Sequence, residues 1–163
     1  MSYGAAHDAG IGSTRADATI ALLSSCNEAP VGKLTLAGVD ALRSRFNDDD
    51  ACDGALAAFA DPAALRAPLR DLLDAEHRFL QAEYEVAQVA DVLRRDQKYA
   101  PVGRPSVHIV QLRKQQAATR QAALIARQVV AQAAQTFVRL SGMTVKAKQS
   151  PSEACAAWLG ALR

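Results

Sequence analysis

Two long stretches of the chain carry apolar residues at seven-residue intervals, the spacing found in helices that pack against each other. In residues 62–98 the two series are Leu65, Leu72, Phe79, Val86 and Leu93, and Ala75, Ala82 and Val89. Residues 106–141 carry two weaker series, from Ile109 to Phe137 and from Leu112 to Leu140, which the polar residues Gln116 and Thr119 interrupt in the first half. Because prolines and a glycine interrupt residues 100–105, we predict an antiparallel, coiled-coil-like hairpin of residues 62–98 and 106–141.

Shorter helices are predicted on either side of the hairpin, because residues that cap helices precede short apolar patterns. They begin after Ser13 or Thr14, after Thr35, at residue 51 for a helix over 51–60, and at Ser150 or Ser152 for a helix over 150–163. Residues 1–12 contain three glycines and are expected to form a loop. Half of the residues are apolar but only 5% are aromatic, a composition that favours helices. We expect one all-α domain over residues 1–163, a helical bundle built around the hairpin, with no transmembrane segment.

The charges are divided unevenly along the chain. Residues 1–100 carry 10 basic and 16 acidic side chains, whereas residues 101–163 carry nine basic side chains and one acidic side chain. The second long helix has arginines at seven-residue spacing, namely Arg113, Arg120 and Arg127. A hairpin that turns near residue 102 aligns Glu76 with Arg127 and Glu83 with Arg120. Two interpretations remain open: the arginines set the register by facing these carboxylates, or they form a stripe that binds phosphates.

Residues with the pattern of a catalytic or metal site are sparse. Asp74 and His77 have the spacing of the carboxylate–histidine pairs of di-iron bundles, but one copy is present and His77 faces away from the hairpin seam. The acidic segment 47–54 fails the spacing of a calcium loop, because Cys52 and Asp53 occupy positions that need an oxygen ligand and a glycine. We expect its carboxylates to cap a helix, and we expect no metal and no cofactor.

The three cysteines, Cys26, Cys52 and Cys155, bear on the compartment. The segment 23–26 resembles the small-residue segment that precedes a lipidated bacterial cysteine, although Asp17 interrupts the apolar stretch before it. Lipidation of Cys26 would leave Cys52 and Cys155 as a pair, and we expect a disulfide between them. The alternative is three reduced cysteines in the cytoplasm. We favour the periplasm or cell envelope.

Basic residues gather where the hairpin turns, and they take no part in the predicted alignment of glutamates with arginines. The predicted partner-binding residues are Arg94, Arg95, Lys98, Tyr99, Arg104 and His108. Helix dipoles explain basic residues at the end of the first long helix, but not Arg104 and His108 at the start of the next. We therefore expect this tip to bind a protein that is acidic at the contact.

The function that this organisation favours is a non-enzymatic helical protein–protein interaction module. A bacterial envelope or secretion-system component, an immunity protein or an adaptor would fit, and the chain could form a homo-oligomer. Nucleic acid is not expected as a partner, because the acidic half of the chain offers the basic half a partner within the molecule, and because aromatic residues are few and the net charge is only +2. The alternative is a small-molecule-binding bundle or an enzyme acting on an anionic substrate. Its sign would be a pocket with two or more arginines or carboxylates that have no partner in the chain.

Overall fold

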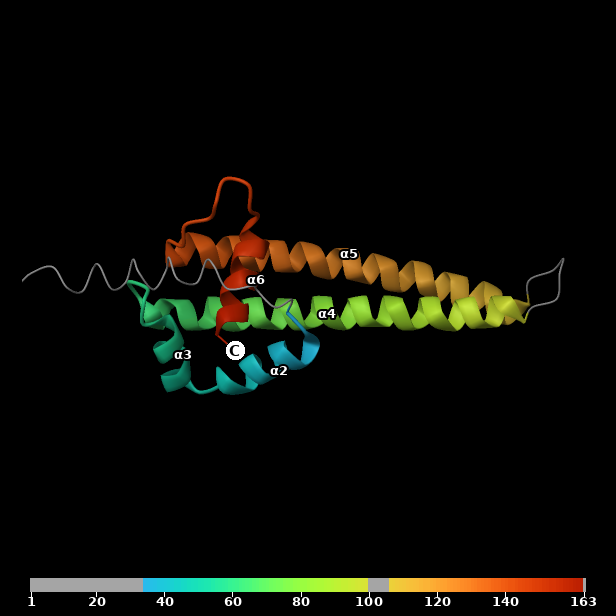
Figure 1. The fold of residues 1–163 in the computed structure, drawn as a ribbon, viewed down its shortest axis with the longest axis horizontal. Coiled ribbons are helices and arrows are strands. Elements are labelled where there is room, and N and C mark those ends of the chain that lie inside the picture. The colour runs from blue at the N-terminus through green and yellow to red at the C-terminus, as the bar shows by residue number, and fades with distance from the viewer. Residues whose placement is uncertain (1–33, 100–105, 163) are drawn as a thin grey trace, which may run out of the picture. The chain divides into compact units, whose positions relative to one another are not determined.

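The computed structural model describes residues 34–99 and 106–162, and between its turns this part of the chain is helical (Figure 1). The helices are α2 (Leu36–Arg45), α3 (Asp49–Leu56), α4 (Pro62–Lys98), α5 (Val107–Ser141) and α6 (Pro151–Ala161). The predicted all-α architecture around a long hairpin is confirmed. All described residues belong to one compact unit, Gly32–Arg163. The helix predicted after Ser13 or Thr14 lies outside the described residues.

Local side-chain chemistry sets the helix boundaries. Every described helix starts after a residue that accepts a hydrogen bond from a free backbone amide, and these residues are Thr35, Asp48, Asp61, Ser106 and Ser150. Gly142 ends α5 with φ 66°, a left-handed conformation that favours glycine. α3 ends at Leu56 rather than at residue 60, because the Phe59 amide turns back to the Leu56 carbonyl at 2.9 Å.

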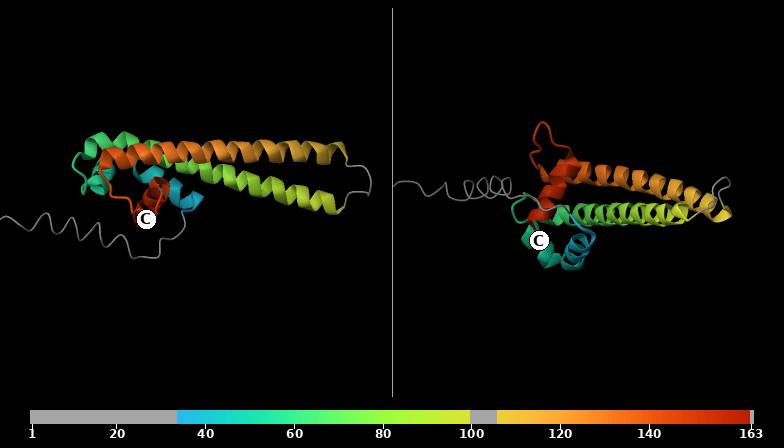
Figure 2. Two further views of the ribbon diagram at one scale, coloured as in Figure 1. Left: turned by 90° about the horizontal axis from the view of Figure 1, so that it is seen from above. Right: turned by 45° about the vertical axis from the view of Figure 1, so that its right-hand side comes forward.

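The short helices gather at one end of the hairpin, as Figures 1 and 2 show. α2 and α3 pack on α4, and α6 packs on α5 and crosses the hairpin. We call this end the head. We call the remainder of the hairpin, residues 77–98 of α4 and 107–129 of α5, the arm.

Two separate groups of buried side chains hold the hairpin together. The larger group lies in the head and joins all five described helices, with fully buried side chains such as Phe46, Leu72, Phe137 and Leu159. The smaller group lies near the far end of the arm and is made by Leu93, Ile109 and Leu112. Between the two groups, residues 77–88 and 113–129 include no fully buried side chain.

The buried face of the hairpin departs from the predicted heptad positions. Phe79 and Val86 are only half-buried, and Leu140 is 53% exposed. In the head, buried side chains extend beyond the heptad series because α4 contacts α2, α3 and α5 at once.

Within the described ranges, no helix is both long enough and apolar enough to cross a membrane.

Candidate interaction surface on the hairpin arm

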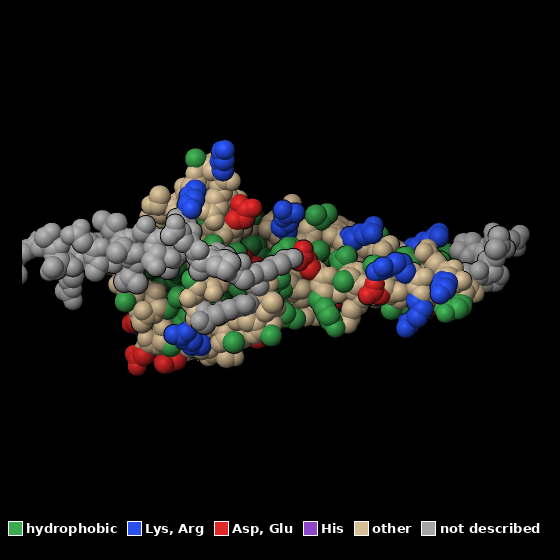
Figure 3. Space-filling model, in the orientation of Figure 1, with side chains coloured by type: hydrophobic (Ala, Val, Ile, Leu, Met, Phe, Trp, Pro, Cys, Tyr) green, Lys and Arg blue, Asp and Glu red, His purple; other side chains and the backbone are tan. Residues whose placement is uncertain are grey.

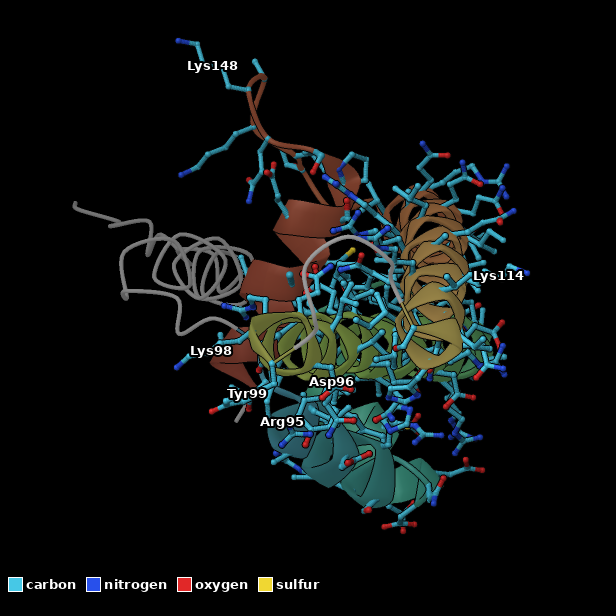
Figure 4. The ribbon with its side chains drawn as sticks, turned by 90° about the vertical axis from the view of Figure 1, so that its right-hand side faces the viewer. Arg95, Asp96, Lys98, Tyr99, Lys114 and Lys148 are labelled. Carbon is cyan, nitrogen blue, oxygen red and sulfur yellow. The ribbon has the colours of Figure 1, made fainter. Side chains whose placement is uncertain are left out.

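The predicted tip residues that the structure describes lie at the end of the arm (Figure 4). Arg104 lies outside the described residues. Lys98 and Tyr99 project on one side of the arm, whereas Lys114 projects on the opposite side, so the basic groups are spread around the tip. Tyr99 is 76% exposed, and the Lys98 ammonium lies 5.7 Å from the centroid of its ring.

Two carboxylates at the tip neutralise part of this charge. Asp96 binds His108 across the two helices, with Nε2 and Oδ2 2.8 Å apart, and lies 3.9 Å from Arg95 Nε. Asp91 pairs with Arg94 one turn along α4. Because the basic members of these pairs are exposed, each pair contributes little to stability, and the guanidinium groups of Arg94 and Arg95 remain open to a partner.

The predicted ladder of ion pairs between α4 and α5 is not formed. Among the described residues, none of Arg113, Arg120 and Arg127 has an ion pair. Glu83 and Arg120 do line the same groove, as the predicted register requires, but they do not meet. The arginines therefore keep their charge exposed along α5.

Glu76, which the predicted register aligns with Arg127, lies at the end of the head next to the arm, is 5% exposed and has no ion pair with Arg127. Burial raises the pKa of its carboxyl to about 7. Across from it on α6 lies Cys155, where burial first and the Glu76 charge second raise the thiol pKa to about 12. Sequence reasoning placed Glu76 on the surface because the heptad pattern gives no sign that α6 covers this part of the seam.

The predicted disulfide between Cys52 and Cys155 is wrong, because both residues are free thiols. Both belong to the core of the head, but α3 carries Cys52 toward α4 and α6 carries Cys155 toward α5. The Cys52 thiol contacts the Phe46 carbonyl oxygen at 3.1 Å, and Cys155 Sγ lies 3.9 Å from the Ala134 carbonyl oxygen. They act as small buried side chains. Cys26 lies outside the described residues.

The polar residues once considered for catalysis or metal binding join the short helices to α4. His77 Nε2 lies 3.2 Å from Asp40 Oδ1 of α2, so the ring faces a neighbouring helix rather than solvent. Asp74 accepts a hydrogen bond from Arg43 Nε at 2.7 Å.

The acidic segment 47–54 has the same structural use. Asp48 caps α3, Asp49 pairs with Arg66 and Arg70, and Asp53 pairs with Arg66. The described residues contain no group of three or more His, Cys, Asp or Glu side chains that could hold a metal ion.

A groove runs between α4 and α5 in the middle of the arm, with a volume of about 580 Å³. We call it the arm groove, and its lining residues are Phe79, Glu83, Val86, Ala87, Ala90, Arg120, Ala123, Leu124 and Arg127. Leu124 is 62% exposed at its edge, and Ile125 and Tyr84 nearby in sequence are 54% and 55% exposed.

Sequence reasoning missed the arm groove, although a signal was present. Leu124 is a large apolar residue outside the two heptad series that form the seam, and it lines the groove. Such residues widen the apolar face of a helix beyond what one partner helix covers. The sequence thus carried a hint of a second contact.

Figure 3 shows basic side chains spread along α5 to the end of the arm, with apolar side chains between them.

Comparison of the chain with family models, with curated proteins and with solved structures finds no match.

Proposed function

We propose that the protein is a non-enzymatic helical interaction module that binds another protein through its arm, at a surface of that protein that is acidic. One observation carries the proposal. α5 has five basic residues and no acidic residue over its 35 positions, and its three arginines at seven-residue spacing have no ion pair among the described residues.

Exposed apolar side chains beside these charges support the same function. Tyr99 at the tip and Leu124 at the arm groove are each more than half exposed. Tyrosine and arginine are among the residues that most often dominate binding energy at protein interfaces. The described arm carries eight Lys and Arg side chains but only four Asp and Glu side chains. This excess of positive charge would attract an acidic protein and speed its association with the arm.

A binding site for a small anion is the second candidate, because Arg120 and Arg127 line one hollow and have no ion pair among the described residues. Small-molecule sites enclose most of their ligand. The exposure of Leu124 leaves the wall of this hollow open to solvent. In the hollow between α2 and α4, by contrast, Arg43 and Arg70 already pair with Asp74 and Asp49. A protein surface suits the open arm better.

The experiment is charge reversal at the tip, measured by co-purification of the full chain from its native host. We expect replacement of Arg94, Arg95 and Arg104 together by Glu to abolish association with the native partner and to leave the thermal melt nearly unchanged. The matched control reverses three exposed basic residues of the head, Arg139, Lys146 and Lys148, and should keep the partner. Retention by the tip variant together with loss by the head variant would contradict binding through the arm.

A further inference from the structure

The arm groove combines an apolar floor with charged edges of opposite sign. Phe79, Val86 and Ala123 supply apolar surface, Glu83 stands on the α4 side, and arginines stand on the α5 side. From residue 79 to residue 90 the groove is about 16 Å long at 1.5 Å per residue, which is three turns of a helix. An object with the width of one helix, an apolar stripe and a charged edge would fit it.

In the head, helix α6 covers the face of the hairpin on which the arm groove lies. Glu76, Glu83 and Ala90 occupy the same heptad position of α4 and so share one face. At Glu76 that face lies against α6, which crosses the hairpin there (Figure 1) and whose Cys155 belongs to the same buried group as Leu72 and Leu73 of α4. On α5, Ala134 shares the heptad position of Arg127, and its carbonyl oxygen is the one that Cys155 Sγ contacts. The arm groove is thus the uncovered continuation of a seam that a helix covers in the head.

The covering helix α6 also brings a carboxylate toward the arginine row. Glu153 lies in the first turn of α6, and its pKa is lowered, chiefly by the hydrogen bonds that it shares with Ser150 and in smaller part by the charge of Arg127. Arg127 is the member of the row nearest the head, and it lines the arm groove. An acidic side chain on a helix across this seam is therefore already present within the chain. Farther along the arm, none of the described acidic residues pairs with Arg120 or Arg113.

We propose that the arm groove binds an amphipathic helix of the partner protein. Its apolar stripe packs on Phe79, Val86 and Leu124, and carboxylates seven residues apart face Arg120 and Arg127. The proposal rests on the proposed function and adds the form of the partner. Two arginines seven residues apart are separated by about 10 Å along α5, which is the separation of residues i and i+7 on the bound helix.

The test uses a synthetic helix as a probe against the full chain. The acidic probe is a fluorescein-labelled 21-residue peptide, that is, three heptads, with Leu at the two seam positions, Glu along one edge and Ala or Gln elsewhere. A basic probe has Lys in place of Glu, and a shuffled probe keeps the acidic composition without an apolar stripe. Fluorescence anisotropy gives the dissociation constants. We expect the acidic probe to bind at least about tenfold more tightly than the basic probe and the shuffled probe to show no binding.

Variants of the arm groove locate the contact. Arg120→Glu with Arg127→Glu should weaken binding of the acidic probe at least about tenfold and strengthen binding of the basic probe. Leu124→Asp should weaken both. The matched controls are Arg139→Glu and Leu140→Asp, exposed residues of α5 outside the groove, and they should change binding less than about twofold. Circular dichroism checks that each variant is folded.

Several results would overturn the proposal. Equal affinity for acidic and basic probes, or equal loss in the Arg139→Glu control, would remove the charge argument. A wild-type dimer that Leu124→Asp converts to a monomer in sedimentation would make a second copy the occupant. Saturable binding of inorganic phosphate that needs Arg120 and Arg127, without binding of the peptide, would indicate a small anion. If one of these results were obtained and the variant with Arg94, Arg95 and Arg104 replaced by Glu still lost the native partner, the proposed function would stand. Binding of a partner helix in the arm groove would then be refuted by itself.

Discussion

Glu76 is the only charged side chain among the buried residues that the structure describes. Its carboxyl lies under α6, and burial moves its pKa from 4.5 to about 7. Between these values the folded protein keeps a proton that the unfolded chain has released. Stability therefore falls as pH rises from 4.5 to 7, and above 7 the full cost of the buried charge, about 3 kcal/mol, is present.

Glu76→Gln removes this charge and keeps the shape of the side chain. At pH 8 we expect the variant to be more stable than the wild type by up to about 3 kcal/mol, and at pH 4.5 we expect nearly equal stabilities. Urea denaturation at the two pH values measures both differences. The matched control is Glu83→Gln, an exposed glutamate one heptad along the same helix, which should differ from the wild type by less than about 0.5 kcal/mol. An equal gain for Glu76→Gln at both pH values would contradict the buried charge.

The same residue shows how far the site could be predicted from sequence. Heptad spacing aligned Glu83 with Arg120, and both line the arm groove in the structure, because local periodicity sets which face of a helix a residue occupies. It failed for Glu76, because a helix more than 70 residues away in sequence covers that face. The tip was predicted as a binding site from its charges, whereas the arm groove depends on how closely two helices approach, which the residue pattern does not state.

At the scale of the elements, α6 is attached by apolar contacts from several directions. Leu159 and Cys155 are fully buried, and Trp158 packs on Phe137 with ring centroids 5.2 Å apart and on Phe59 at 5.8 Å. Phe59 comes shortly after the end of α3, and Phe137 lies in α5, so α6 also links these parts of the head.

Leu159→Ala tests this attachment. We expect a loss of about 2–5 kcal/mol in the free energy of unfolding, because the change removes buried methyl groups and leaves a cavity. Leu140→Ala on α5 is the matched control, since Leu140 is 53% exposed, and it should cost less than about 1 kcal/mol. Chemical denaturation followed by circular dichroism measures both. A loss for Leu159→Ala no larger than for the control would show that α6 is not part of the cooperative core.

The helices themselves were predictable where the chain carries its own signals. Ser106 and Gly142 mark the ends of α5, and Thr35 marks the start of α2, through side chains or dihedral angles a few residues from the boundary. How the helices pack was less accessible. Arg70 of α4 donates hydrogen bonds to the carbonyl oxygens of Phe46 and Asn47, at 3.0 and 3.2 Å, and so holds the turn between α2 and α3. No spacing rule connects residues 23 or 24 positions apart.

At the scale of the described unit, the two groups of buried side chains are separated by a stretch of hairpin that has no fully buried side chain. Over residues 77–88 and 113–129 the helices are held by their own backbone hydrogen bonds and by half-buried contacts such as those of Phe79 and Val86. Local opening costs least where few apolar side chains are buried.

Hydrogen exchange read by mass spectrometry should reveal this difference. We expect amides in residues 77–88 and 113–129 to exchange at least about tenfold faster than those in residues 62–76 and 130–141. Peptides from both halves of α4 and α5 supply the comparison within one sample, so solvent conditions are identical. Uniform protection along α4 would contradict a middle section that opens independently of the head.

Because this stretch has no fully buried side chain, the length of the arm can change by one heptad at a time. Removing residues 81–87 from α4 together with 116–122 from α5 deletes one heptad from each side of the hairpin. The deletion would shorten the arm by about 10 Å and preserve which residues face the seam. The groups around Leu72 and Leu93 both lie outside the deleted segments. Paired gains and losses of seven residues are therefore a route by which the distance between the tip and the head can change while both ends keep their packing.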